Sequence, residues 1–291
     1  MTTIRRHMLN ALGKLFAEDN LVVIRNEGGL ASQIGFWALG HELAGSGYDV
    51  KFDNSWFTSN GMDLNGRFPR NLDFPKAFPS LNLVEASKFE RTILKKLNNF
   101  TAGDPTTVMA PAYLGGFYDR WKLVVKHQKL LSESFAPDAS YFSNEDLELL
   151  EQIKREPNTC GVHVRRGDLS NDHQHYGKAL GPDYFKRALA EVDARHEDTT
   201  YYFFSDEPNW VKQNIGRSLG PETSYVVVDN NGSDRGFVDL YLMSRCQSFV
   251  SSQGAFGKYA RLLGDPSRLI VEPSSHALFR KDDKNVTVLD V

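Results

Sequence analysis

The segment 159–168 constrains this chain more than any other, because a strand-like apolar run ends there in two adjacent arginines. It reads Thr-Cys-Gly-Val-His-Val-Arg-Arg-Gly-Asp. Val162 and Val164 give the predicted strand one apolar face. His163 and Arg165 project from the other face, near the carboxyl end where open α/β sheets bind ligands. The pattern predicts an anion site, such as one for a diphosphate, which matches the donor fork of arginine. A structural arginine paired with a nearby carboxylate is the alternative.

Length and composition bound the class of protein. The chain has 291 residues, which favours two domains, and its 41% hydrophobic and 24% charged residues are typical of a soluble globular protein. A net charge of -3 provides no general attraction to nucleic acid, so a basic site has to be local. Cys160 and Cys246 lie far apart within apolar patterns, which indicates buried thiols in a reducing, cytoplasmic compartment.

Membrane attachment is predicted to be peripheral at most. No apolar run approaches the roughly 20 residues needed to span a bilayer. The basic and apolar segment 1–16 lacks the features of a secretory signal. It predicts a short amphipathic helix that packs on the protein, with contact to a membrane surface as the alternative.

Alternating strand and helix patterns predict an α/β protein with two doubly wound domains. Residues 21–24 and 48–52 read as strands around a glycine turn and a helix at 30–44, whereas 54–79 reads as loops and short helices that shape a groove. The elements expected after a helix start at 143–146 are a helix at 147–153, strands at 161–164, 201–204, 225–228 and 248–250, and helices at 183–194, 237–246 and 255–263. We therefore expect domains at 1–150 and 151–291 that face each other across a ligand cleft.

Three further segments carry polar residues at predicted strand ends or helix starts. Gly28 and Gly29 open a helix, so its N–H groups could face an anion, or the turn is simply a tight connection. Asp206 follows a strand and either accepts from a base or ribose or caps the next helix. Asp239 is an isolated acid in an apolar helix that needs a donor, such as the paired N–H groups of guanine, unless it caps the helix.

The histidines do not predict a metal site. His163 is distant in sequence from His173 and His175, which lie two residues apart in a polar loop. An Asp-x-Asp motif at a strand end is also missing from the sequence. We expect no metal and no cofactor.

Taken together, four motifs resemble those of the α-1,2-fucosyltransferases of glycosyltransferase family 11, which share elements with α-1,6- and protein O-fucosyltransferases. Residues 28–33 are similar to the family's Gly-Gly-Leu-Gly-Asn-Gln, and 163–168 match its His-x-Arg-Arg-Gly-Asp in full. Residues 204–207 resemble its Phe-Ser-Asp-Asp, and 239–244 match its Asp-Leu-Tyr-Leu-Met-Ser. Residues 113–118 resemble, more weakly, the family's central Tyr-x-x-Gly-Tyr/Phe-x stretch.

The resemblance implies a GT-B fold, GDP-fucose as the donor, inversion at the anomeric carbon and no metal. By matching position, Arg165 would hold the β-phosphate of the leaving GDP, with Arg166 beside it. His163 and Asp239 would bind ribose and guanine, and Asp206 would support that pocket. Gly28, Gly29 and Gln33 would line the junction of donor and acceptor.

Two segments depart from the family pattern. Ser32 stands where the family has asparagine, and residues 253–259 read Gln-Gly-Ala-Phe-Gly-Lys-Tyr in place of its Asn-Ser-Ser/Thr-Phe-Ser-Trp-Trp. Ser251 and Ser252, with the N–H groups of the following helix, are expected to replace the lost phosphate contacts. Asp168, Asp172 and His175 are candidates for the base that deprotonates the acceptor.

These features lead to the hypothesis of a cytoplasmic bacterial enzyme that adds L-fucose, α-1,2 to galactose, during synthesis of a surface polysaccharide or O-antigen. Its partners would be the nucleotide sugar and a galactose-containing glycan, including a lipid-linked acceptor at the inner membrane face, and not nucleic acid. Two alternatives are a GDP-sugar transferase of another linkage or sugar, such as α-1,6 or α-1,3 fucose, and a binding module without turnover.

Overall fold

The computed structural model describes residues 20–59, 61–63, 68–97, 105–116, 120–167, 169, 178–232, 234–276 and 284–291. The helix expected within 1–16 lies outside these residues. The chain divides into two compact units, Met1–Ser134 and Phe135–Val291, which we call the N-terminal and C-terminal units.

The N-terminal unit is built on a parallel three-stranded sheet in the order β2-β1-β5, and a two-stranded antiparallel pair, β3-β4, lies in the loop region expected at 54–79. Its elements are β1 (Leu21–Arg25), α2 (Leu30–Gly45), β2 (Asp49–Asp53), α3 (Ser55–Ser59), β3 (Met62–Asp63), β4 (Phe68–Pro69), α4 (Phe74–Ala77), α5 (Lys88–Leu97), a 3-10 turn (Pro105–Thr107), β5 (Ala112–Leu114), α6 (Trp121–Lys126) and α7 (Gln128–Ser134).

Alternate residues of the central strand β1 face opposite sides of this sheet. Val22 and Ile24 pack in one core with α2, whereas Leu21 and Val23 pack in another with Leu94 of α5. The first four side chains of β1 are therefore buried, which explains why residues 21–24 read as a continuous apolar run.

The C-terminal unit is built on a parallel six-stranded sheet in the order β11-β10-β9-β6-β7-β8. Its elements are a 3-10 turn (Ala139–Tyr141), α8 (Asn144–Arg155), β6 (Thr159–Val164), α11 (Pro182–Asp193), β7 (Thr200–Ser205), α12 (Pro208–Asn214), a 3-10 turn (Gly216–Ser218), β8 (Tyr225–Val228), α13 (Gly236–Arg245), β9 (Ser248–Val250), α14 (Ala255–Leu263), β10 (Leu269–Pro273), a 3-10 turn (Ser274–His276) and β11 (Val286–Leu289).

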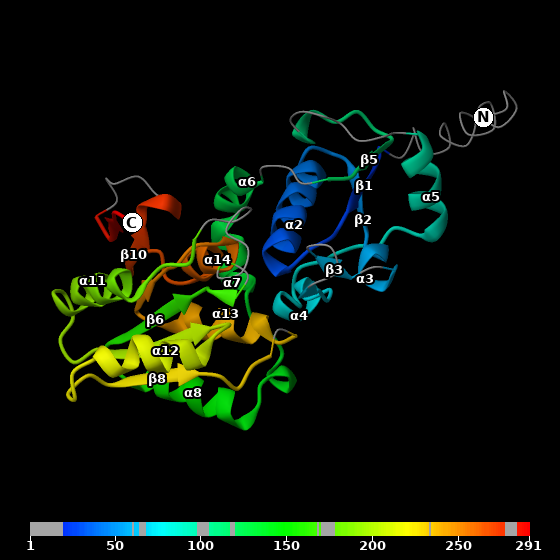
Figure 1. Ribbon diagram of the computed structural model, residues 1–291. Coiled ribbons are helices and arrows are strands. Elements are labelled where there is room, and N and C mark those ends of the chain that lie inside the picture. The colour runs from blue at the N-terminus through cyan, green and yellow to red at the C-terminus, as the bar shows by residue number, and fades with distance from the viewer. Residues whose placement is uncertain are drawn as a thin grey trace, which may run out of the picture. The chain divides into compact units, whose positions relative to one another are not determined.

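Helices cover both faces of this sheet. Cys160, Val162 and Val164 of β6 share a core with buried side chains of α11 and α12. On the other face, Gly161 of β6 lies close to Met243 of α13, and α8 and α14 also contact α13 (Figure 1). A central strand covered on both sides has every residue buried, as β6 does.

The expected boundary at 150/151 differs from the observed division after Ser134, because α8 packs on α13 and so belongs to the C-terminal unit. Ser143 and Asp146 form a capping box that starts α8 at the helix start read from the sequence. The helices expected at 30–44, 183–194, 237–246 and 255–263 are confirmed to within one or two residues.

Candidate functional site

The sheet of the C-terminal unit reverses its strand order between β6 and β9. From β6 the following strands β7 and β8 extend to one edge, and from β9 the strands β10 and β11 extend to the other. At such a switch point the connections leave on opposite sides of the sheet, so the carboxyl ends of the two strands border a ligand-binding crevice. The residues that follow β6 and β9 are therefore the first candidates for a site.

Arg165 is the first residue after β6, and two contacts hold it at the turn that follows β9. Its backbone N–H donates to Ser252 Oγ at 2.9 Å. Its guanidinium lies against Gly254, where an added Cβ would stand 2.2 Å from Nη1. Gly254 has a φ of 102°, a conformation that favours glycine. The half-buried Arg165 side chain thus occupies space that only a glycine leaves open.

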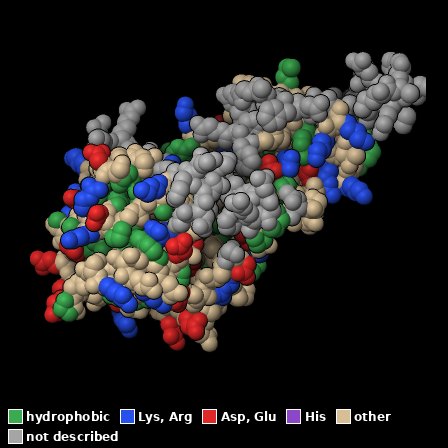
Figure 2. All heavy atoms as spheres, viewed as in Figure 1, with side chains coloured by type: hydrophobic (Ala, Val, Ile, Leu, Met, Phe, Trp, Pro, Cys, Tyr) green, Lys and Arg blue, Asp and Glu red, His purple; other side chains and the backbone are tan. Residues whose placement is uncertain are grey.

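The helix α14 begins at Ala255, directly after this glycine. Among the described residues no side chain caps its first turn, and its first turn holds no acidic residue. Free N–H groups and the helix dipole make such an end attractive to anions. Figure 2 shows acidic and basic side chains interspersed over the visible part of the C-terminal unit, with no large basic patch among the described residues in that view.

His163 is buried on β6, and its Nδ1 lies 3.0 Å from Ser252 Oγ. Burial lowers the pKa of His163 to about 3, and the positive charge of Arg165 acts in the same direction. The ring is therefore neutral at pH 7 and interacts through hydrogen bonds. The Ser252 hydroxyl connects it to the backbone of Arg165.

Arg166 is held by the protein itself. Its guanidinium lies 3.7 Å from the ring centroid of Trp210, and its Nε donates to Glu207 Oε2 at 3.1 Å. Its Nη1 donates to the carbonyl of Leu180 at 3.3 Å. For Arg166, this geometry corresponds to the alternative of a structural arginine paired with a carboxylate.

Asp206 anchors the loop that carries these arginines. Its Oδ1 accepts from the backbone N–H of Arg166 at 2.8 Å, and its Oδ2 accepts from that of Gly167 at 3.0 Å. A Cβ on Gly167 would stand 2.9 Å from Oδ2, so a glycine permits this approach. The side chain of Asp206 is exposed. These two bonds tie the loop after β6 to the carboxyl end of β7.

Asp239 lies in the first turn of α13 beside a second carboxylate. Asn231 Nδ2 donates to Asp239 Oδ1 at 2.7 Å and to Asp146 Oδ1 at 2.8 Å, and Arg235 lies 3.4 Å from Asp146. Burial raises the pKa of Asp239 to about 7, and the nearby Asp146 acts in the same direction. Burial and the second carboxylate thus disfavour the ionised form of Asp239, which a hydrogen-bond donor stabilises.

The residues after β9 have unequal roles. Ser251 is buried, and its Oγ donates to the carbonyl of Ser252 at 2.9 Å. Gln253, which was considered only as a departure from the family pattern, is also buried and donates from Nε2 to the carbonyl of Lys178 at 2.7 Å. Its place between a predicted strand and a predicted helix is a sequence signal that could have identified Gln253 as a candidate site residue.

In the N-terminal unit, Gln33 ties the glycine turn to a neighbouring segment. Its buried Nε2 donates to the carbonyls of Gly28 at 3.0 Å and Asn71 at 2.8 Å. Its Oε1 accepts from the N–H groups of residues 73 and 74, both at 2.9 Å. Gly29 is the N-cap of α2, and the Arg70 side chain lies 3.7 Å from the position of a Cβ on it. The geometry gives Gln33 a positioning role.

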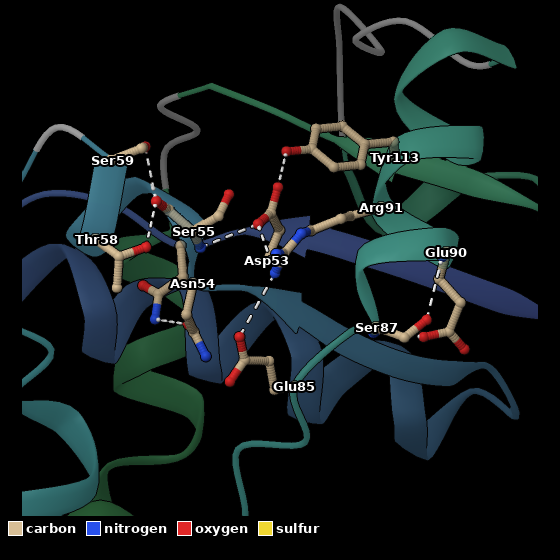
Figure 3. A network of polar contacts seen from close by, with 11 residues as sticks. Asp53, Asn54, Ser55, Thr58, Ser59, Glu85, Ser87, Glu90, Arg91 and Tyr113 are labelled. Carbon is tan, nitrogen blue, oxygen red and sulfur yellow. Dashed lines mark hydrogen bonds and ion pairs between the residues drawn. The ribbon is translucent and has the colours of Figure 1, made fainter.

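A polar network crosses the carboxyl edge of the N-terminal sheet (Figure 3). Asp53, at the end of β2, accepts from the Tyr113 hydroxyl of β5 at 2.7 Å and from the N–H of Ser55 at 3.0 Å. Arg91 of α5 lies 3.8 Å from the same carboxylate. Burial acts to raise the pKa of Asp53, but these donors outweigh it and hold the pKa below its usual value. The network keeps Asp53 ionised and joins two strand ends to α5.

Some predicted site residues lie outside the described part of the chain. They are Asp168, Asp172 and His175. Among the described residues, no group of three or more His, Cys, Asp or Glu side chains is placed to hold a metal ion. No helix in that part of the chain has the length and apolarity needed to cross a membrane.

Comparisons with known proteins identify a family and a fold that this chain resembles. Residues 106–286 match the model of a family described as Glycosyl transferase family 11. An Escherichia coli alpha-1,2-colitosyltransferase is 22% identical over 260 residues, which cover 81% of this chain and 85% of that protein. Human galactoside alpha-(1,2)-fucosyltransferase 1 is 31% identical over 105 residues, which cover 35% of this chain and 28% of that protein.

A third relative is the Escherichia coli O-antigen biosynthesis glycosyltransferase WbnK, 24% identical over 132 residues. The match covers 44% of this chain and 42% of WbnK, so the chain spans less than half the length of two of these three relatives. The crystal structure of NodZ alpha-1,6-fucosyltransferase co-crystallized with GDP has a TM-score of 0.55 and 17% identity, and covers 88% of this chain and 95% of NodZ. The expected GT-B-like fold with two parallel sheets is thereby confirmed.

Proposed function

The chain belongs to glycosyltransferase family 11, and we propose that it transfers L-fucose from GDP-fucose to a galactose hydroxyl of a glycan, with an α-1,2 linkage and inversion at the anomeric carbon. The observation that carries the proposal is the position of the Arg165 guanidinium against Gly254, directly before the N-terminus of α14. This arrangement puts two sources of positive charge at the switch point between β6 and β9.

In this reaction the acceptor oxygen attacks the anomeric carbon as the bond to the β-phosphate oxygen breaks, and that oxygen keeps the electron pair. Negative charge therefore grows on the departing GDP. Arg165 and the N–H groups of α14 offset this charge, and preorganised donors of this kind lower the barrier because they need no rearrangement. The acceptor proton leaves to a base for which Asp168, Asp172 and His175 are the candidates.

His163 and Asp239 would bind the nucleoside. The neutral ring of His163 can share a hydrogen bond with ribose without adding charge beside Arg165. The carboxylate of Asp239 can accept from both the ring N–H and the amino group of guanine, and these donors favour its ionised form over the protonated one. The C-terminal unit would thus hold the nucleotide sugar, and the N-terminal unit, with Gly28 and Gly29, the acceptor side.

The acceptor is a galactose-containing glycan in the synthesis of a surface polysaccharide or O-antigen, made in the cytoplasm or at the inner membrane face. Support comes from the relatives named for O-antigen biosynthesis and for galactoside fucosylation. Colitose transfer is the second candidate, because the colitosyltransferase aligns over most of both chains. Colitose is fucose without its 3-hydroxyl, so the sugars of the two donors differ only at carbon 3 of the ring.

A donor and acceptor array tests the proposal. The protein is incubated with GDP-fucose, GDP-colitose and other GDP-sugars against galactosides, and products are identified by mass spectrometry and linkage analysis. We expect α-1,2-fucosylated galactoside, and a loss of about 100- to 1000-fold in turnover for Arg165→Ala. Transfer of colitose alone would establish the second candidate. GDP binding without transfer or donor hydrolysis would contradict both.

A further inference from the structure

Gln253 carries a buried hydrogen-bond acceptor that the described residues leave unsatisfied. The residue is 4% exposed, and its Nε2 donates to the carbonyl of Lys178 at 2.7 Å. Its Oε1 has no partner among the described residues. The Lys178 carbonyl fixes the orientation of the amide, because the reversed amide would place two acceptor oxygens against each other. A buried acceptor of this kind is uncommon in folded proteins and requires an explanation.

The position of Gln253 links this acceptor to the proposed donor site. It lies between Ser252, which accepts from the backbone of Arg165, and Gly254, which the Arg165 guanidinium contacts. Its partner Lys178 is two residues from Leu180, whose carbonyl accepts from Arg166. The amide is therefore bonded close to the residues that hold Arg166, and it lies in the turn that contacts Arg165.

The chemistry of Oε1 defines what it can bind. It needs a donor, and phosphate oxygens are acceptors, so the diphosphate cannot satisfy it. A sugar attached to the β-phosphate carries ring hydroxyls, which do donate. Building on the proposed function, we propose that Gln253 is a donor-specificity residue whose Oε1 accepts a hydrogen bond from a ring hydroxyl of the transferred sugar.

This assignment has a consequence for donor choice. A site built to bond a hydroxyl discriminates strongly against the analogue that lacks it, because its own buried polar atom is then left unpaired. Removal of the hydroxyl that Gln253 reads lowers donor affinity by about 10- to 100-fold, and removal of either other hydroxyl has a smaller effect. If Gln253 reads the 3-hydroxyl, it separates fucose from colitose.

A double-mutant cycle between protein and donor tests the inference. Binding of GDP, GDP-fucose and the 2-, 3- and 4-deoxy analogues of GDP-fucose is measured by calorimetry for the full chain. The variant Gln253→Met keeps the length of the side chain and removes both polar atoms. Gln247→Met is the matched control at the amino end of β9, where Oε1 accepts from Thr159 and Nε2 donates to the Glu156 carbonyl.

We expect Gln253→Met to lose about 10- to 100-fold in affinity for GDP-fucose, to bind GDP within about twofold of wild type, and to be indifferent to one deoxygenation that wild type penalises. Gln253→Glu retains an acceptor oxygen and should retain that penalty despite weaker binding overall, which keeps the test open if the methionine variant fails to fold. Gln247→Met should leave the pattern of deoxygenation penalties unchanged.

Three results would overturn the inference. The first is that Gln253→Met loses the same affinity for GDP as for GDP-fucose, which would assign Oε1 to the nucleotide. The second is that each deoxygenation carries the same penalty in wild type and in Gln253→Met. The third is that Gln253→Met binds GDP-fucose as tightly as wild type does. Failure of the proposed function is separate, because the wild-type protein itself would then neither bind nor turn over GDP-fucose.

Discussion

Gly254 determines how closely Arg165 can approach the start of α14. A side chain at this position would meet Nη1 at 2.2 Å and Cδ at 3.0 Å, and the φ of 102° would strain any residue with a Cβ. The sequence alone shows the glycine but not the arginine that fills the space, because 89 positions separate them.

Gly254→Ala should therefore displace the Arg165 guanidinium. We expect GDP affinity to fall by about 10-fold or more and stability to fall by about 1–3 kcal/mol from backbone strain. Calorimetric GDP titration and urea unfolding measure the two effects. Gly45→Ala is the control, since a Cβ there meets nothing within 4 Å and alanine suits the end of a helix. Equal GDP affinity in both variants would show that the contact is unimportant.

Arg165 and Arg166 show how much the sequence alone reveals about a single residue. Adjacent in sequence, they are chemically identical, and the pattern predicts an anion site for both. The structure identifies two partners of Arg166, Trp210 and Glu207, which belong to the segment after β7. Partners from other elements cannot be identified from residue type and spacing alone.

At the scale of elements, β6 explains why the imidazole of His163 stays neutral. The strand is central, covered on both faces, and ends beside the positive Arg165. Both burial and charge lower the pKa of His163, to about 3. The unfolded chain binds a proton at this side chain below a pKa of about 6.5, whereas the folded chain does not.

This difference predicts a pH dependence of stability. The contribution of His163 is fully present above pH 6.5 and is lost as the pH falls from 6.5 toward 3, with a slope that approaches about 1.4 kcal/mol per pH unit. Wild type should lose about 2 kcal/mol more than His163→Gln between pH 7 and pH 5. Urea unfolding at both pH values measures the difference, and the same loss in both proteins would contradict the assignment.

Long, strongly periodic elements could be predicted, and short ones could not. α2, α11 and α14 follow from helical spacing, and α8 from its capping box. β5 has only three residues, less than two full alternations, and the buried run of β10 carries no alternation at all. Neither strand was predicted, although β10 lies beside the switch point.

At the scale of the whole molecule, two units with parallel sheets each place polar residues at a carboxyl edge. In the N-terminal unit these residues form the network in which Asp53 contacts Ser55, Tyr113 and Arg91. In the C-terminal unit they surround the switch point between β6 and β9. The α/β class and the two-unit organisation could be predicted from alternating patterns, but the division after Ser134 depends on the packing of α8 and could not.

Calorimetric titration of GDP into wild type and Arg165→Ala tests the central claim, that this guanidinium binds the leaving diphosphate. The backbone N–H that donates to Ser252 remains in the variant, and a thermal melt of both proteins checks that the variant is folded. We predict GDP affinity at least about 10-fold weaker in Arg165→Ala, the loss typical of a charge-assisted hydrogen bond. GDP affinity equal to that of wild type, in a folded variant, would contradict the account.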